Sequence, residues 1–175
     1  MSDEHVTASP GLVELVGEDY RARGGGLMSP GFHAAVVYRF GRWAKSRPQP
    51  QRLLWSVLHR LLYVLVRNLY GIELPAQAVV GRRLVIAHQG GIVLNPQTCI
   101  GDDCLLRHNT TIGVSGVGGS VPTIGNRVEI GAGAVLIGGI SIGDDVHIGP
   151  NAVVMKDVPA GGSAFASPAR IMKPQ

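Results

Sequence analysis

The stretch IGNRVEIGAGAVLIGGISIGDDVHIGPNAVV, residues 124–154, repeats one pattern every six residues. A branched apolar residue stands at each sixth position, and a glycine follows it directly in four of the first five cases. Four positions later in each repeat comes a second series that holds only small or branched apolar residues. The first series is Ile124, Ile130, Leu136, Ile142, Ile148 and Val154, and the second is Val128, Ala134, Ile140, Val146 and Ala152.

A repeat of six matches neither an α-helix of about 3.6 residues per turn nor a flat strand of period two. It fits a short strand followed by a tight turn, with three repeats making one coil of about eighteen residues around a narrow apolar axis. Glycine after the inward residue lets the backbone turn where a Cβ atom would be crowded, so we expect these glycines to form the corners. The repeat therefore predicts a parallel β-helix shaped like a triangular prism.

The repeat extends backwards and sets the organisation of the chain. Leu94, Ile100, Leu106 and Ile112 continue the first series, and Cys104 falls in the second as a small core residue. We expect a mainly β protein with two parts: a small N-terminal helical region, 1–70, and a β-helix domain, 71–175. The helical segments are predicted at 11–22, 31–46 and 51–70, and a C-terminal tail at 157–175.

Two interruptions of the repeat mark the places to look for function. Two residues are added between Ile86 and Leu94, which predicts a bulge next to His88. Residues 113–123, GVSGVGGSVPT, lack a branched residue at the expected position and predict an extruded loop. We expect both interruptions in the same third of the prism. The register also places His88 and His108 at one corner of successive coils, about 5 Å apart.

Composition limits the class of protein. The chain has 175 residues, a formal net charge of +4 and a pI near 9.4, which favour an anionic partner. The two cysteines, Cys99 and Cys104, suit neither a disulfide framework nor a zinc site, and no metal is expected. The N-terminus lacks the pattern of a signal peptide, so we expect a cytoplasmic protein.

The segment QRLLWSVLHRLLYVLVRNLY, residues 51–70, is apolar but interrupted by a basic stripe. The stripe consists of Arg52, His59, Arg60 and Arg67. Two interpretations stay open: a helix buried at a subunit contact, or a surface helix, 52–70, that touches anionic lipid at the inner face of a membrane.

Residues 70–172 resemble a known family. The segments GIELPAQAVVGRRLVIAHQGGIVLN, IGAGAVLIGGISIGDDVHIGPNAVVMKDVP and SPARIM are similar, in order and spacing, to hexapeptide-repeat acyltransferases. Within that family they look like the branch of serine O-acetyltransferases and polysaccharide O-acetyltransferases, whose prisms are left-handed. The resemblance implies that His88 is a general base and that Glu73, fifteen residues earlier, orients it.

The chemistry suits these groups. Moving an acetyl group from a thioester to a hydroxyl requires removal of the hydroxyl proton, which a neutral imidazole can accept near pH 7. A backbone N–H near Gly113 or Gly133 is a candidate donor to the oxyanion. The resemblance implies acetyl-CoA as co-substrate, bound along a groove between subunits of a homotrimer. The matching positions are Gly113, Gly131, Ala132, Gly133, Gly138 and Gly139, with Lys156 and Arg170 facing the phosphates.

The acceptor is predicted from departures from the family pattern. Serine O-acetyltransferases carry Asp-His at the catalytic position and Arg-His at the end of the loop, where this chain has Ala87-His88 and Ser120-Val121. The charges that recognise a free amino acid are therefore missing. Arg107-His108 resembles the polysaccharide-modifying relatives. We expect His108, Arg107 and Ser120 to bind a hydroxyl of a sugar or polysaccharide precursor, and L-serine is the alternative acceptor.

Three other functions have little support in the sequence. A γ-type carbonic anhydrase uses the same prism, but it needs a pair of histidines five residues apart, which His88, His108 and His147 do not provide. A non-catalytic scaffold would not need His88 or Glu73. A nucleic-acid partner would require a basic face with interleaved aromatic residues, which the prism lacks.

Overall fold

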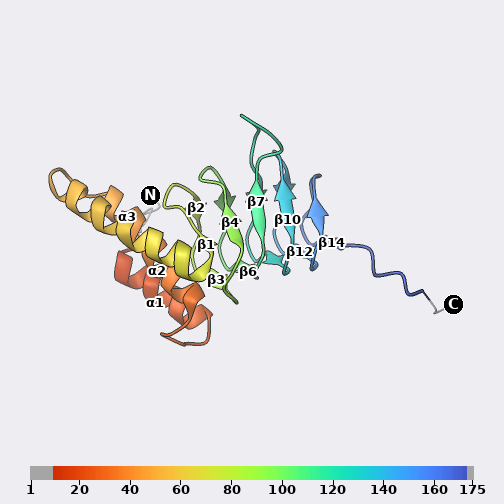
Figure 1. Ribbon diagram of the computed structural model, residues 1–175, viewed down its shortest axis with the longest axis horizontal. Helices are drawn as coiled ribbons and strands as arrows, with labels where there is room; N and C mark the ends of the chain where they lie inside the picture. Colours follow the sequence, from red (N-terminus) through yellow and green to blue (C-terminus); the bar gives the residue numbers. More distant parts are fainter. Residues whose placement is uncertain (1–9, 173–175) are drawn as a thin grey trace, which may run out of the picture.

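The computed structural model describes residues 10–172, as three helices followed by a prism of short parallel strands (Figure 1). Residues 1–9 of the predicted helical region and 173–175 of the predicted tail lie outside the described residues. The helices are α1 (Leu12–Ala22), α2 (Pro30–Lys45) and α3 (Gln51–Tyr70). They confirm the three helical segments expected from the sequence.

Local chemistry sets the helix ends. Pro30 occupies the first position of α2, where its missing N–H costs no hydrogen bond. At the end of α3, Gly71 adopts a left-handed conformation with φ 63°, and its N–H donates to the carbonyl of Arg67. This turn leads the chain directly from α3 into the prism.

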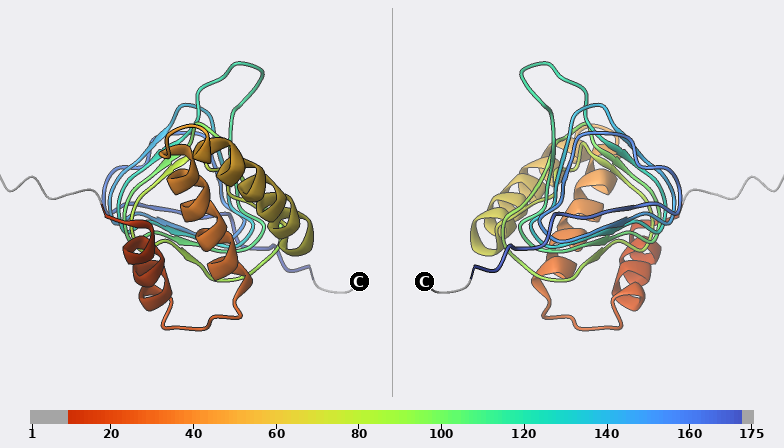
Figure 2. Two further views of the ribbon diagram at one scale, coloured as in Figure 1. Left: turned by 90° about the vertical axis from the view of Figure 1, so that its left-hand side faces the viewer. Right: turned by 90° about the vertical axis from the view of Figure 1, so that its right-hand side faces the viewer.

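Fourteen strands within residues 10–172 form three parallel sheets, one for each side of a left-handed prism (Figure 2). The first sheet contains β1 (Ile72–Glu73), β4 (Ile92–Leu94), β7 (Thr111–Gly113), β10 (Val135–Ile137) and β13 (Val153–Val154). The second contains β2 (Val79–Val80), β5 (Cys99–Ile100), β8 (Thr123–Ile124) and β11 (Ser141–Ile142). The third contains β3 (Val85–Ile86), β6 (Leu105–Leu106), β9 (Glu129–Ile130), β12 (His147–Ile148) and β14 (Ser163–Ala164).

Strand register confirms the predicted coil lengths. Ile124 pairs with Ile142, as an uninterrupted coil of three sixes requires. Ile86 pairs with Leu106, two residues further along the chain than in a regular coil, which confirms the bulge. Ile100 pairs with Ile124 across the coil that contains the extruded loop. The interruptions therefore add residues to corners without shifting the inward series.

The prism interior is the apolar core. Leu106, Ile112, Leu136 and Ile148 each have 0% of their surface exposed, as expected for the first series. The Cys104 thiol is also fully buried, and this burial raises its pKa to about 11. A thiol with this environment stays protonated near neutral pH, which agrees with a packing role.

The glycines that follow the inward residues avoid contact with the next coil. A Cβ atom on Gly125 would lie 2.8 Å from the backbone nitrogen of Asp144, and one on Gly131 would lie 2.6 Å from that of Pro150. The left-handed turn residues come two positions later, as at Arg127 with φ 54°. Crowding is therefore confirmed as the reason for these glycines, while the reversal of the chain depends on a different position.

The three corners of the prism differ in content. The ladder corner, between the second and third sheets, comprises residues 81–84, 101–104, 125–128 and 143–146. The histidine corner, between the third and first sheets, comprises residues 87–91, 107–110, 131–134 and 149–152. The loop corner, between the first and second sheets, includes residues 114–122, which project from the prism (Figure 2).

The placement of the two interruptions corrects one prediction. The bulge lies at the histidine corner and the extruded loop lies at the loop corner, so they do not share one third of the prism. The reason is their position relative to the first sheet: the bulge precedes β4, whereas the loop follows β7. The two interruptions therefore lie at opposite ends of the strands of the first sheet.

A buried ion pair attaches the helices to the prism. The Arg39 guanidinium on α2 donates hydrogen bonds to both carboxylate oxygens of Asp19 on α1, at 2.8 and 3.0 Å. It also donates to the carbonyl oxygens of Val80, at 3.1 Å, and Gly81. The Asp19 carboxylate accepts a bond from the backbone N–H of Leu84. Because both charges are buried and Arg39 donates four hydrogen bonds, two of them to carbonyls of the prism, the helical region is held against the first coil.

The outward side of α3 is exposed and apolar in the single chain. Leu53, Leu54, Leu61 and Leu69 are each 65% exposed. No helix within residues 10–172 is long and apolar enough to cross a membrane. An apolar surface of this extent indicates contact with another molecule.

Candidate active site

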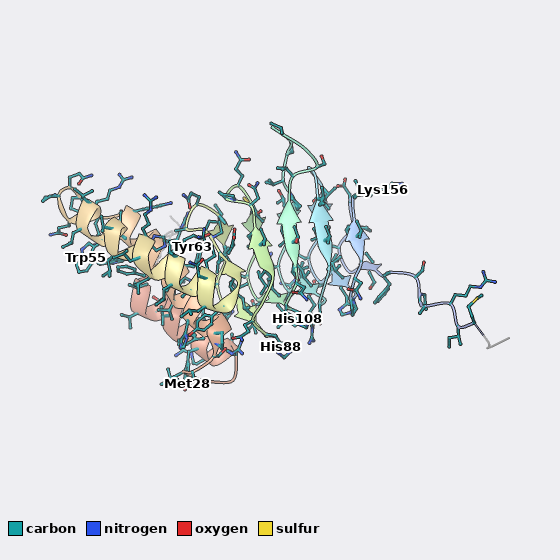
Figure 3. The ribbon with its side chains drawn as sticks, in the orientation of Figure 1. Met28, Trp55, Tyr63, His88, His108 and Lys156 are labelled. Atoms are coloured by element: carbon teal, nitrogen blue, oxygen red, sulfur yellow. The ribbon has the colours of Figure 1, made fainter. Side chains whose placement is uncertain are left out.

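Two imidazoles lie together at the histidine corner, as the register predicts. The ring centroids of His88 and His108 are 5.6 Å apart, with the rings at 79° to one another. Pairing of Ile86 with Leu106 produces this arrangement, because each histidine follows its inward residue by two positions. Figure 3 shows both side chains on the same side of the prism.

The two histidines differ in burial. The His88 side chain is exposed and makes no hydrogen bond with any residue between 10 and 172, so its ring nitrogens are accessible to a substrate. His108 is half-buried, and its Nδ1 atom is buried without a hydrogen-bond partner in the same range. A buried polar atom of this kind costs free energy unless a ligand or water satisfies it. The exposed His88 ring is therefore suited to accept a proton from a substrate, and the half-buried His108 ring beside it is suited to bind that substrate.

The bulge fixes the approach to His88. Gly90 and Gly91 have positive φ values of 101° and 62°, a backbone conformation that residues with a side chain rarely adopt. A Cβ atom on Gly91 would lie 2.3 Å from the Asn109 Oδ1 atom, and the Asn109 N–H donates to the carbonyl of Gly90 at 2.8 Å. The next coil therefore holds the two added residues in place.

The structure does not join Glu73 to His88. Glu73 is half-buried on β1, where it pairs with Val93, and no hydrogen bond or ion pair links its carboxylate to His88 within the described part of the chain. Its charge acts instead on Tyr63 of α3: burial of the Tyr63 phenol, and secondarily the Glu73 carboxylate, raise the pKa of that phenol. An orienting role for Glu73 stays a prediction.

The predicted acceptor residues lie at two corners. Arg107 is exposed beside His108 at the histidine corner, and its backbone N–H donates to the carbonyl of Ile130. Ser120 lies in the extruded loop, against Gly139, where an added Cβ would come within 2.7 Å of the Ser120 Cβ. Within one chain, the first sheet separates Ser120 from His108.

The predicted coenzyme residues divide in the same way. Gly131, Ala132 and Gly133 lie at the histidine corner, one coil beyond His108. Gly113, Gly138, Gly139 and Lys156 lie along the loop-corner edge of the first sheet, and the N–H of Gly138 donates to the carbonyl of Gly113. Arg170 is exposed in the tail.

One predicted oxyanion donor is already engaged. The backbone N–H of Gly133 donates to the carbonyl of His108 at 3.0 Å. A donor used in this bond between coils is not free for an oxyanion, so Gly133 does not suit that role in this conformation.

Sequence reasoning did not find Arg23, which follows α1. Its guanidinium donates to the carbonyl oxygens of Ile86 and Ala87, the second at 3.1 Å, and so reaches the residues directly before His88. Sixty-four residues separate Arg23 from Ala87 in the sequence. No local pattern connects them, and only the packing of the helices on the prism brings them together.

Metal ligands do not gather at the site. Between residues 10 and 172, no group of three or more His, Cys, Asp or Glu side chains is placed to hold a metal ion.

Comparisons with known proteins agree with this geometry. The family described as bacterial transferase hexapeptide (six repeats) matches residues 122–156. A serine acetyltransferase from Helicobacter pylori is 40% identical over 148 residues, which cover 83% of each chain. The putative colanic acid biosynthesis acetyltransferase WcaB from Escherichia coli is 38% identical over 90 residues, covering 50% of this chain and 56% of that protein.

Solved structures extend the comparison to the whole fold. Soybean serine acetyltransferase complexed with serine has a TM-score of 0.77 and 28% identity, covering 94% of this chain and 70% of that one. A serine acetyltransferase isoform from Entamoeba histolytica has a TM-score of 0.76, and this chain spans 62% of its length. The similarity therefore includes the helical region as well as the prism.

Proposed function

Because this chain belongs to the hexapeptide-repeat acyltransferase family, in the branch of serine and polysaccharide acetyltransferases, we propose that it acetylates the hydroxyl of L-serine. The acetyl donor would be acetyl-CoA, and the products O-acetylserine and free coenzyme A. The observation that carries the choice of acceptor is the 40% identity to the Helicobacter pylori serine acetyltransferase over 83% of both chains. This reverses the order of the two acceptors expected from the sequence.

The geometry supports direct transfer with His88 as the general base. The exposed imidazole accepts the hydroxyl proton as the serine oxygen attacks the thioester carbon. The tetrahedral intermediate then collapses, the carbon–sulfur bond breaks, and the imidazolium returns the proton to the departing thiolate. A positioned base of this kind contributes about 10²–10⁴-fold to the rate. No covalent acetyl-enzyme is required, and the buried Cys104 thiol is not available to form one.

A sugar hydroxyl is the second candidate acceptor. The observation that favours it is the absence of charge at Ala87, Ser120 and Val121. At the matching positions, serine O-acetyltransferases carry the Asp-His and Arg-His pairs described above. The similarity to the putative colanic acid biosynthesis enzyme supports it over half of the chain. A sugar would need hydrogen bonds from His108 and Arg107 and no ion pair.

Release of free thiol from acetyl-CoA tests both candidates. The purified protein is given acetyl-CoA with L-serine in one reaction and with a panel of sugars and nucleotide sugars in others. Turnover with L-serine alone would support the proposal. Turnover with a sugar and none with L-serine would replace it by the second candidate.

We also propose that the working form is a homotrimer in the cytoplasm. Support comes from the separation of the two edges of the first sheet: a groove that uses both His88 and the extruded loop requires a second copy to bring a loop corner to a histidine corner. The exposed face of α3 would then be buried between copies. Light scattering coupled to gel filtration measures the mass in solution, and a monomer at assay concentration would contradict the proposal.

Contact between α3 and lipid is the alternative use of that face. Arg52, Arg60 and Arg67 give it a basic border that complements anionic headgroups. Co-sedimentation with vesicles containing phosphatidylserine distinguishes the two cases. Binding by the trimer would show that the face stays exposed after assembly.

A further inference from the structure

Four arginines connect the helical region with the prism, and one of them, Arg23, has no carboxylate partner within residues 10–172. Arg39 pairs with Asp19, Arg82 pairs with Glu14 and Glu18, and Arg83 pairs with Glu18. Arg23 forms no ion pair with any residue between 10 and 172. Its half-buried guanidinium is therefore a positive charge without a counter-charge in the part of the chain that the structure describes.

The position of this charge is fixed by backbone contacts. One terminal nitrogen of Arg23 donates to the carbonyl of Ile86, and the other donates to the carbonyl of Ala87 at 3.1 Å. A guanidinium carries five N–H groups, so at least three are left for other acceptors. Because Ala87 directly precedes His88, Arg23 contacts the backbone immediately before the predicted general base.

Arg23 is followed by a glycine-rich turn. Gly24, Gly25 and Gly26 follow Arg23 with positive φ values of 77°, 92° and 99°, and they turn the chain back toward α2. The carbonyl of Leu27 is held by the Nε2 atom of His33 at 2.7 Å. Figure 3 shows Met28 of this loop on the same side of the molecule as His88.

We propose that Arg23 binds the α-carboxylate of the acceptor amino acid whose hydroxyl is acetylated at His88. This inference rests on L-serine as the acceptor. An arginine can bind a carboxylate through two parallel N–H groups, which would fix the orientation of serine as well as its position. Arg23 thus supplies, from the helical region, the positive charge that is missing at Ser120 and Val121 in the loop.

Paired substrates separate this role from a structural one. Kinetics are measured with L-serine and with L-serinamide, which keeps the hydroxyl and the ammonium but lacks the carboxylate. Wild type, Arg23→Gln and Arg23→Lys are compared, because glutamine keeps an N–H donor for the two carbonyls without the charge. Arg21→Ala is the matched control, since Arg21 is exposed on α1 and takes no part in the site. Thermal melting checks that each variant is folded.

Arg23→Gln should raise the KM for L-serine by about 10- to 100-fold, as expected for loss of a charge-assisted hydrogen bond, and change the KM for L-serinamide less than threefold. Arg23→Lys should fall between wild type and Arg23→Gln, and Arg21→Ala should match wild type. The KM for acetyl-CoA should stay constant throughout.

Three results would overturn the assignment, and they are distinguishable. An equal loss on both acceptors, or a fall in kcat without a rise in the KM for L-serine, would mean that Arg23 only positions the turn before His88. Wild-type protein that acetylates neither acceptor would overturn L-serine as substrate and this inference with it. A folded Arg23→Gln variant with unchanged kinetics would also reject the carboxylate contact.

Discussion

The ladder corner and the histidine corner of the prism have similar turns, apart from the bulge before β4, and opposite chemistry. At the ladder corner, Arg83 and Arg127 form ion pairs with Asp103 and Asp145 in the next coil. The distances from the arginine Nε to the aspartate Oδ1 atom are 2.5 and 2.6 Å. Backbone N–H groups in the same turns donate to side-chain oxygens of the neighbouring coil. At the histidine corner, no described residue donates to or accepts from the side chain of His88.

The difference teaches where a repeating fold keeps its reactivity. A corner whose polar groups form hydrogen bonds with neighbouring coils stabilises the fold and leaves no free donor or acceptor for a ligand. A corner where the repeat is interrupted holds ring nitrogens that only a ligand or water can satisfy. Substitutions at the histidine corner are therefore expected to change activity, and substitutions at the ladder corner are expected to change stability.

The largest expected effect is on catalysis at the histidine corner. His88→Ala should lower kcat for acetyl transfer by about 10²–10⁴-fold, because the proton acceptor is removed. The fold should be unaffected, since the side chain is exposed. The control is His147→Ala on β12, whose ring lies 3.4 Å from the Glu129 carboxylate and away from the site. Thiol-release kinetics and thermal melting of both variants make the measurement, and near-normal turnover by His88→Ala would eliminate it as the base.

The next effect is on stability at the ladder corner. Asn126 accepts a hydrogen bond from the N–H of Asp102 at 2.8 Å and donates to Asp144. Asn126→Ala should lower the free energy of unfolding by about 1–3 kcal/mol, because the Asp102 N–H loses its partner. Denaturant titration measures this loss, while kcat per folded molecule stays at the wild-type value. A variant of unchanged stability and reduced kcat would show that the two corners do not divide stability from activity.

A smaller effect on binding is expected at His108. His108→Ala should raise the KM of the acceptor roughly five- to tenfold, which corresponds to one lost hydrogen bond, and leave kcat within about threefold. The reason is its half-buried ring, whose Nδ1 atom has no partner within residues 10–172. Steady-state kinetics with varied acceptor tests the split. A collapse of kcat at constant KM would mean that His108, and not His88, removes the proton.

The smallest effect is the pH dependence of the ladder. Hydrogen bonds from Arg83 and Arg127 lower the pKa values of Asp103 and Asp145 below the usual 3.8. A lowered pKa in the folded state stabilises the fold at pH above the unfolded value, and the contribution is lost as the pH falls through the folded value. The melting temperature of wild type relative to the Asp103→Asn, Asp145→Asn double variant should therefore be constant from pH 7 to 5 and converge below about pH 4. Convergence already at pH 5 to 6 would contradict this origin.

Much of the fold follows from the sequence because a six-residue repeat constrains every coil in the same way. The inward series, the buried Cys104, the bulge and the separation of His88 from His108 all come from counting. The extruded loop was placed at the wrong corner because the six-residue spacing does not show at which end of the first-sheet strands an interruption falls. The bulge precedes β4, whereas the loop follows β7.

The rest of the site depends on packing that the repeat does not encode. Arg23 reaches Ala87 because ion pairs such as Arg39–Asp19 and Arg82–Glu18 hold α1 and α2 against the first coil. The Glu73 carboxylate lies near Tyr63 of α3 and is not hydrogen-bonded to His88. A contact between a helix and a prism 64 residues away has no local sequence signal.

The central claim is that acetyl transfer takes place at the histidine corner. A crystal structure of the protein with bound coenzyme A tests it most directly. The account predicts that the coenzyme sulfur lies within hydrogen-bonding reach of the His88 ring, with the pantetheine chain running past Gly131 toward the C-terminal coils. Coenzyme A bound with its sulfur at the ladder corner, or elsewhere away from His88, would contradict the account.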